Sequence, residues 1–147
     1  MTAEAQISRT IDEAFRAAYL LSGSSEIAEN AVLAGIAALD VTGVAVQTLI
    51  VESAKAAIRQ RPRISRPWDR ASSNLSRELQ RLTLLEPGSR DCFVLRVLYR
   101  MTPEICCAIL NLTIREFEDS LCAAYQALPF IEAGRKSERH RSEGMRR

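Results

Sequence analysis

The residue types that most often do chemistry in proteins are scarce in this chain of 147 residues, and their spacing forms no catalytic or metal site. Cys92, Cys106, Cys107 and Cys122 include no pair at the two-residue spacing of a zinc or redox motif. The one histidine, His140, lies in a charged segment. The six glycines are scattered and form no phosphate-binding loop and no nucleophile turn. We therefore expect no enzymatic activity, no metal and no cofactor, and reduced cysteines that pack as small hydrophobic residues.

A run of arginines in the middle of the chain is the clearest chemical feature. Residues 59–70 hold five arginines, two prolines and one aspartate, for a net charge of +4. Proline interrupts helices and like charges repel, so this segment is predicted to be a linker or an extended basic arm. The candidate contacts to phosphate or to a partner are Arg59, Arg61, Arg63, Arg66 and Arg70. A solvated linker is the alternative, and Trp68 is expected to pack on a helical lobe rather than to stack on a base.

The composition sets the class of protein. With 47% hydrophobic and 26% charged residues and a net charge of +2, the chain is typical of a globular protein and not of a disordered one. The longest apolar run, Ala31 to Leu39, is about half the length of a membrane span. No secretory signal opens the chain, so we expect a cytoplasmic protein.

The hydrophobic spacing predicts helices throughout, and therefore an all-α fold. Three helices are expected in the first half, over residues 10–21, 25–39 and 44–59. Thr10 and Glu13 have the spacing of a capping box at the start of the first helix. These three helices are predicted to form a bundle over residues 1–59, followed by the basic linker 60–74.

The second half predicts four further helices, over residues 75–85, 89–100, 103–110 and 113–128. Thr102 and Pro103 are typical of an N-cap and a first helical position. Thr113 and Glu116 form another capping box. The last helix carries an apolar stripe at Ile114, Phe117, Leu121, Tyr125 and Leu128.

A short capped helix, a turn of about three residues and a longer capped helix make residues 102–128 a helix-turn-helix candidate. The predicted second lobe is 75–130. It is followed by a basic tail, 131–147, which is expected to be mobile. Tyr99 and Tyr125 lie on apolar stripes and are expected in the core.

The residues from Leu79 to Thr113 resemble region 4 of the bacterial sigma factors. A leucine-rich helix is followed by Pro87, by an apolar helix, by Glu104-Ile105-Cys106 in place of the family's "EIA", and by Leu110-Asn111-Leu112-Thr113 in place of its "LGIS". Residues 14–32 are similar to region 2 of the extracytoplasmic-function sigma factors. The two patterns occur in the family's order, with the basic linker between them.

The resemblance implies a transcription protein that binds RNA polymerase core and promoter DNA. Further partners would be an anti-sigma protein, another regulatory protein or a second copy of the chain. No membrane partner is expected. Region 2 of the family binds the polymerase clamp, which makes Glu26, Glu29, Asn30 and Leu33 the candidate polymerase contacts. Region 4 reads promoter DNA in the major groove. The candidate DNA contacts are Thr113, Arg115, Glu116, Glu118, Asp119, Arg96 and Arg100.

Several positions depart from the family pattern. Leu33 and Ala34 stand where the family usually has a glutamine and a glutamate, and residues 44–58 have no aromatic residue and only Lys55 as a basic one. Residues 113–128 carry Arg115 against three acids, for a net charge of −2 that repels DNA phosphates. The alternative is therefore a sigma-like interaction module that has lost DNA reading and acts through protein contacts or dimerisation.

Overall fold

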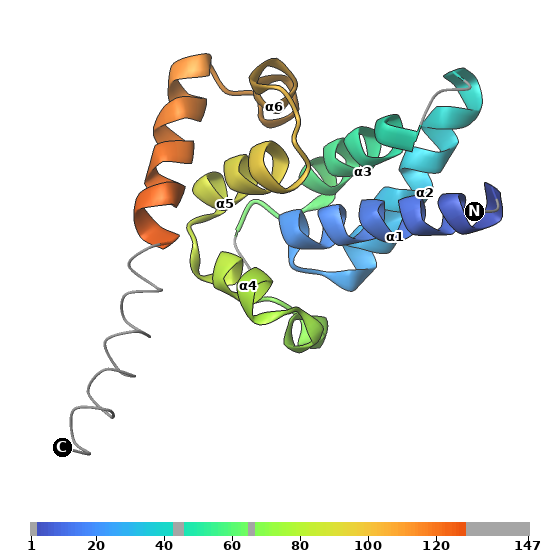
Figure 1. Ribbon diagram of the computed structural model, residues 1–147, viewed down its shortest axis with the longest axis horizontal. Helices are drawn as coiled ribbons and strands as arrows, with labels where there is room; N and C mark the ends of the chain where they lie inside the picture. The colour runs from blue at the N-terminus through green and yellow to red at the C-terminus, as the bar shows by residue number, and fades with distance from the viewer. Residues whose placement is uncertain (1–2, 43–45, 65–66, 129–147) are drawn as a thin grey trace.

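Every regular element of the computed structural model is helical, across the residues that the structure describes (3–42, 46–64 and 67–128; Figure 1). The α-helices are α1 (Ala3–Ser22), α2 (Ser25–Thr42), α3 (Val46–Gln60), α4 (Arg77–Gln80), α5 (Pro87–Phe93), α6 (Pro103–Leu110) and a last helix over residues 114–128. Two 3-10 turns, Arg70–Asn74 and Arg81–Leu84, and a π-helical turn, Val94–Leu98, complete the set. Because no strand occurs among these residues, the all-α prediction is confirmed.

The first three helices pack closely on one another because small side chains line the faces that they share. Seven alanines of these helices have no exposed surface: Ala14, Ala17, Ala18, Ala28, Ala31, Ala54 and Ala57. Leu20 and Leu21 of α1 are equally buried, and Tyr19 beside them is 3% exposed. Small residues let helix axes approach, so dispersion contacts between backbones add to the burial of the leucines.

The predicted start of the first helix at Thr10 is wrong. α1 begins seven residues earlier, at Ala3, and the Thr10 hydroxyl donates to the Gln6 carbonyl oxygen at 2.8 Å, one turn back along the same helix. No glycine or proline precedes Thr10, so nothing stops the helix from extending towards the N-terminus. A threonine followed three residues later by a glutamate is also compatible with a helix interior, where the hydroxyl bonds to a preceding carbonyl.

Gly35 allows α2 to approach α3. A Cβ atom at Gly35 would lie 2.6 Å from Ser53 Oγ and 3.1 Å from Leu49 Cδ1. We expect Gly35→Ala to lower the free energy of unfolding by about 1–3 kcal/mol, because overpacking between the helices outweighs the gain in helix propensity of up to about 1 kcal/mol. Urea denaturation followed by circular dichroism measures this change.

The matched control removes the atom that the new methyl group would meet. Ser53 Oγ is buried and makes no hydrogen bond within the described residues, so Ser53→Ala alone is expected to be nearly neutral. The double variant Gly35→Ala/Ser53→Ala should recover part of the loss. A Gly35→Ala protein as stable as the parent would show that α2 and α3 are not in close contact at this point.

The helix predicted over residues 89–100 differs at both ends. Pro87 occupies the first turn of α5, where its missing N–H is not needed, so the helix begins two residues earlier. From Val94 the helix widens into the π-helical turn, in which the Tyr99 N–H donates to the Val94 carbonyl oxygen at 3.1 Å. The helix predicted over 75–85 is shorter, since Ser76 caps α4 and the 3-10 turn follows it directly.

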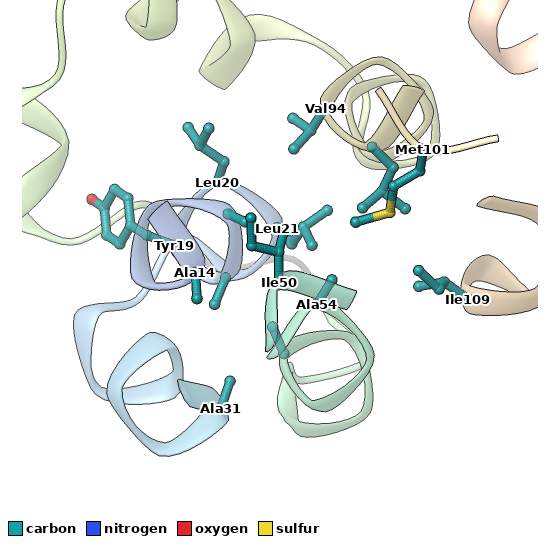
Figure 2. Packing of buried hydrophobic residues seen from close by; sticks show 14 of the residues in the cluster. Ala14, Tyr19, Leu20, Leu21, Ala31, Ile50, Ala54, Val94, Met101 and Ile109 are labelled. Atoms are coloured by element: carbon teal, nitrogen blue, oxygen red, sulfur yellow. The ribbon is translucent and has the colours of Figure 1, made fainter. Parts of the chain in front are cut away.

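The second half packs against α1 and α3. α5 and the π-helical turn contact α1, and α6 contacts α3. Figure 2 shows the buried side chains that meet there: Leu21, Ile50 and Ala54 from the first half, and Val94, Met101 and Ile109 from the second. The buried hydrophobic residues therefore form one cluster that joins both halves of the chain.

Candidate protein and nucleic-acid interfaces

α6 and the helix over residues 114–128 are joined by a sharp bend. The Thr102 hydroxyl accepts from the Ile105 N–H at 3.3 Å, and Pro103 follows it in the first turn, which confirms both predictions for the start of α6. α6 ends where Asn111 adopts a left-handed backbone, with φ of 55°. The Leu112 N–H then donates to the Cys107 carbonyl oxygen at 3.1 Å. The chain therefore changes direction within a few residues, as Figure 1 shows between α6 and the orange 114–128 helix.

The capping box at the start of the 114–128 helix is also confirmed. The Thr113 N–H donates to Glu116 Oε1 at 3.0 Å, and the Glu116 N–H donates to Thr113 Oγ1 at 3.2 Å. The backbone hydrogen bond from Thr113 holds the pKa of Glu116 below its usual value. Glu116 is thus a structural residue at the helix start, which reduces its freedom to contact a base.

The exposed face of this helix is acidic. Arg115, Glu116, Glu118 and Asp119 are all exposed, whereas Phe117 is buried. One arginine against three carboxylates leaves a net negative charge on the surface that would have to enter a DNA groove. Since DNA affinity comes mainly from neutralising phosphates, this face is poorly suited to groove entry unless other basic groups surround it.

The two other arginines predicted at this surface differ in their availability. Arg96 is half-buried, and its Nη1 donates to the Met101 carbonyl oxygen at 3.4 Å, so its guanidinium faces the chain that follows it. Arg100 is exposed and has a left-handed backbone, with φ of 53°. Arg100 is therefore the more available of the two cations.

The four residues that the resemblance assigns to polymerase contact share one exposed face of α2. Glu26, Glu29, Asn30 and Leu33 are spaced by three and four residues, and all four are exposed. The buried residues of α2, which include Ala28 and Ala31, lie on the side that packs in the bundle. Leu33 is 59% exposed, so this face combines carboxylates with an unusually exposed leucine.

The arginine-rich segment is anchored in its second part. The Trp68 ring lies edge-on to Tyr19, with ring centroids 5.4 Å apart, which confirms that this tryptophan packs on a helical lobe. Gly23, with φ of +70°, lies beneath it, and a Cβ there would be 3.2 Å from the indole. The Asp69 N–H donates to the Gly23 carbonyl oxygen at 3.0 Å. A simple solvated linker is therefore wrong for residues 68–69.

Asp69 caps α2 from a distant part of the chain. Its Oδ2 accepts from the Ser25 N–H at 2.6 Å, and its Oδ1 accepts from the Tyr19 hydroxyl at 2.8 Å and from the Ala71 N–H at 3.0 Å. Burial alone would raise the pKa of Asp69, but these hydrogen bonds outweigh burial and lower the pKa below 3.8. The charged form is thus the one that the fold stabilises.

Stability should therefore fall in acid through Asp69. Because the folded-state pKa is lowered, the stabilisation is complete above the unfolded value of 3.8 and is lost as pH falls through the folded value. We expect Asp69→Asn to cost about 1–2 kcal/mol at neutral pH and to flatten the decline between about pH 5 and about pH 2. Thermal unfolding across this range measures both. Asp119→Asn, on an exposed surface, is the control, and equal acid slopes for Asp69→Asn and the parent would contradict this assignment.

The first part of the arginine run takes part in a buried ion pair. Arg61 Nη1 lies 2.7 Å from Asp91 Oδ2 and also donates to the Leu21 carbonyl oxygen at 3.1 Å. Arg90 is next to Asp91, with Nη2 to Oδ1 at 3.9 Å, and its guanidinium carbon is 5.0 Å from the centre of the Trp68 ring. Burial raises the pKa of Asp91 and lowers that of Arg90, while their opposite charges work against both shifts.

The five arginines of the run therefore differ in their availability. Arg59, Arg63 and Arg70 are exposed and can contact a partner. Arg61 is held in the ion pair with Asp91, so it is predominantly structural. Arg66 lies outside the described residues, as does the predicted tail 131–147.

The cysteines only partly follow the prediction. Cys92 and Cys106 are buried, and burial raises the pKa of each thiol to about 11, so both are protonated and unreactive at neutral pH. Cys107 is half-buried, and Cys122 is exposed rather than packed in the core. Among the described residues, no cluster of three or more histidine, cysteine or acidic side chains is placed to hold a metal ion. No described helix is long and apolar enough to cross a bilayer.

Comparisons of this chain with protein-family models, with curated proteins and with solved structures find no match.

Proposed function

We propose that this protein is a sigma-factor-like transcription protein that binds core RNA polymerase, with α6 and the 114–128 helix as its helix-turn-helix. The observation that carries the proposal is the pair of separately capped helices with a left-handed bend at Asn111. This pair occupies the positions at which the sequence resembles region 4 of the sigma factors. The packing of α6 on α3 supports a fixed presentation of the pair, because it ties this unit to the first three helices.

The exposed face of α2 is the proposed polymerase contact. Glu26, Glu29 and Asn30 provide exposed polar groups on this face. Leu33 provides apolar surface, since 59% of the residue is exposed. A row of this kind suits a protein partner, since an apolar residue with a polar rim is typical of interfaces.

A pull-down with purified core RNA polymerase of the host tests this contact. The double charge reversal Glu26→Lys/Glu29→Lys should weaken binding at least about tenfold, because two contacts would become repulsive. Glu78→Lys/Glu86→Lys is the matched control, as both residues are exposed and lie in the second half of the chain. Equal retention of polymerase by both double variants would overturn the assignment of the α2 face.

The acidic surface of the 114–128 helix favours a second candidate function, an interaction module of sigma-like fold that does not read DNA. Its partner would be a regulatory protein or a second copy of the chain. Glu118 and Asp119 are exposed beside Arg115, and Arg96 is turned to the Met101 carbonyl oxygen. Such a surface repels phosphates more than it attracts them.

Duplex DNA separates the two candidates. Promoter reading requires a mobility shift at low salt that weakens steeply as salt is raised. An interaction module gives no shift at low salt, and size-exclusion chromatography with light scattering then shows a dimer or a complex with a protein partner. Glu118→Lys/Asp119→Lys should create or strengthen non-specific DNA binding in either case, because it reverses the charge of this face.

A further inference from the structure

A small cavity lies where the first and second halves of the chain meet. It has a volume of about 130 Å³ and is lined by Leu21, Arg61, Arg63, Trp68, Pro87 and Arg90, among others. The residues come from the end of α1, from the chain after α3 and from the start of α5. A single water needs roughly 10–15 Å³ of such space, so the cavity has room for a polar group of several heavy atoms.

Arg90 is the unusual member of this lining. It is only 7% exposed, yet its side chain donates no hydrogen bond to any described residue, and its Nε is buried without a partner. The 3.9 Å between its Nη2 and Asp91 Oδ1 is too long for a hydrogen bond, and its guanidinium carbon lies 5.0 Å from the centre of the Trp68 ring, which offers no oxygen acceptor. A buried N–H without an acceptor is costly, and Asp91 Oδ1, which is also buried without a hydrogen bond, lies too far from Arg90 to serve, so an oxyanion in the cavity would supply the acceptor that Nε lacks.

The charges around the cavity do not balance. Arg61, Arg63 and Arg90 line it, and the one carboxylate paired with them is Asp91, whose Oδ2 is already bound by Arg61. Two positive charges are left over among these four residues. Arg63 is exposed and has no ion pair with a described residue, so it is free to close over a bound group. Three guanidinium groups around one small space are typical of oxyanion recognition, because their N–H groups match the oxygens of a phosphate.

We propose that this cavity binds the phosphate group of a small molecule, either inorganic phosphate or a phosphate monoester, between Arg61, Arg63 and Arg90. A doubly charged phosphate would neutralise the excess charge and supply the acceptor that Arg90 lacks. A small ligand fits better than a nucleic-acid backbone, since a guanidinium that is 7% exposed inside a cavity of about 130 Å³ is out of reach of a phosphate fixed in a duplex. This inference does not depend on the proposed polymerase contact.

Isothermal titration calorimetry of the full chain with sodium phosphate, at an ionic strength held constant with sodium chloride, tests the site. We expect saturable binding with a stoichiometry near one and a rise in melting temperature with phosphate but not with chloride. Arg63→Gln should weaken binding at least about tenfold, because it removes one charged donor. Arg77→Gln makes the same change in net charge at an exposed residue of α4 and should leave phosphate binding unaltered.

A second ligand and a second variant identify the source of the phosphate and test the role of Arg90. A nucleoside monophosphate that binds more tightly than inorganic phosphate makes the ligand a monoester, and equal or weaker binding makes it the free ion. Arg90→Met should abolish binding while circular dichroism shows the parental helix content. The proposal is overturned if phosphate behaves like chloride, if Arg63→Gln binds phosphate as well as the parent, or if duplex DNA is bound through Arg63 while neither small ligand is.

Discussion

Replacing Asp91 with alanine is expected to lower the free energy of unfolding by about 3–5 kcal/mol. Asp91 is 2% exposed and lies 2.7 Å from Arg61, so its removal leaves the Arg61 charge without its partner in a partly buried position. Arg90, which is also buried, loses its nearest carboxylate at the same time. Urea denaturation at neutral pH, followed by circular dichroism, measures the loss.

Two controls separate this ion pair from a general effect of losing a carboxylate. Asp119→Ala, on the exposed face of the 114–128 helix, should change stability by less than about 0.5 kcal/mol. The double variant Arg61→Met/Asp91→Leu should be more stable than Asp91→Ala, since it removes the Arg61 charge as well and leaves only Arg90 without a carboxylate. A loss below about 1 kcal/mol for Asp91→Ala would mean that water reaches the pair.

Phe117→Ala is expected to cost about 3–5 kcal/mol. Phe117 is 2% exposed and is the largest fully buried side chain among the described residues, so its truncation leaves a cavity between the 114–128 helix and the rest of the protein. Thermal and urea unfolding measure the loss, and the spectrum of the native variant shows whether the helix content falls as well.

Tyr125→Ala is the matched control on the same helix. Although it lies on the apolar stripe with Phe117 and was predicted in the core, Tyr125 is 51% exposed and contacts Phe93 edge-on at 5.9 Å between ring centroids. Its truncation should cost less than about 1.5 kcal/mol. Similar losses for the two variants would contradict the observed orientation of this helix.

The helix caps and the bend before the last helix are predicted well, because they are formed by residues that lie close together in the sequence. Thr102 with Pro103, and Thr113 with Glu116, satisfy the first N–H groups of the helices that they begin, and both signals are confirmed. A bend at residues 111–112 follows from the left-handed backbone that Asn111 tolerates. Capping and turn signals of this kind involve only a few consecutive residues, so they can be recognised from a single sequence.

The exposed side of a helix is harder to predict than its existence. Tyr125 shares the spacing of Phe117, but it is 51% exposed, whereas its neighbour Ala124 has no exposed surface. The helix start predicted from Thr10 and Glu13 is wrong for a different reason. The Thr10 hydroxyl donates to the Gln6 carbonyl oxygen, one turn back in the same helix, and caps no helix start. Spacing alone does not tell which of two compatible arrangements the tertiary structure selects.

The contacts that organise the arginine-rich segment are not visible in the sequence. Asp69 caps the start of α2 at Ser25, 44 residues away, and Arg61 pairs with Asp91 in a helix of the other half. A weak signal for the second contact exists, since Arg90 and Asp91 directly precede the apolar residues of a helix that is predicted to be buried. Pairing them with the linker, however, requires knowing that α5 lies against α1.

The candidate interfaces also combine features that the sequence reveals with features that depend on tertiary contacts. The resemblance to the sigma factors places Glu26, Glu29, Asn30 and Leu33 at a contact surface, and their common exposure on α2 is compatible with that role. The acidic character of the 114–128 helix is also evident from the sequence. The orientation of Arg96, which donates to the Met101 carbonyl oxygen, is not evident from the sequence, because Arg96 lies within the π-helical turn Val94–Leu98, which was not predicted.

The affinity of the purified chain for purified core RNA polymerase decides whether this protein acts as a sigma-like subunit. We expect a saturable complex of one chain per polymerase, which Glu26→Lys/Glu29→Lys weakens at least about tenfold and Glu78→Lys/Glu86→Lys leaves intact. The absence of any complex at micromolar concentrations, or a complex that the α2 double variant forms equally well, would contradict this expectation.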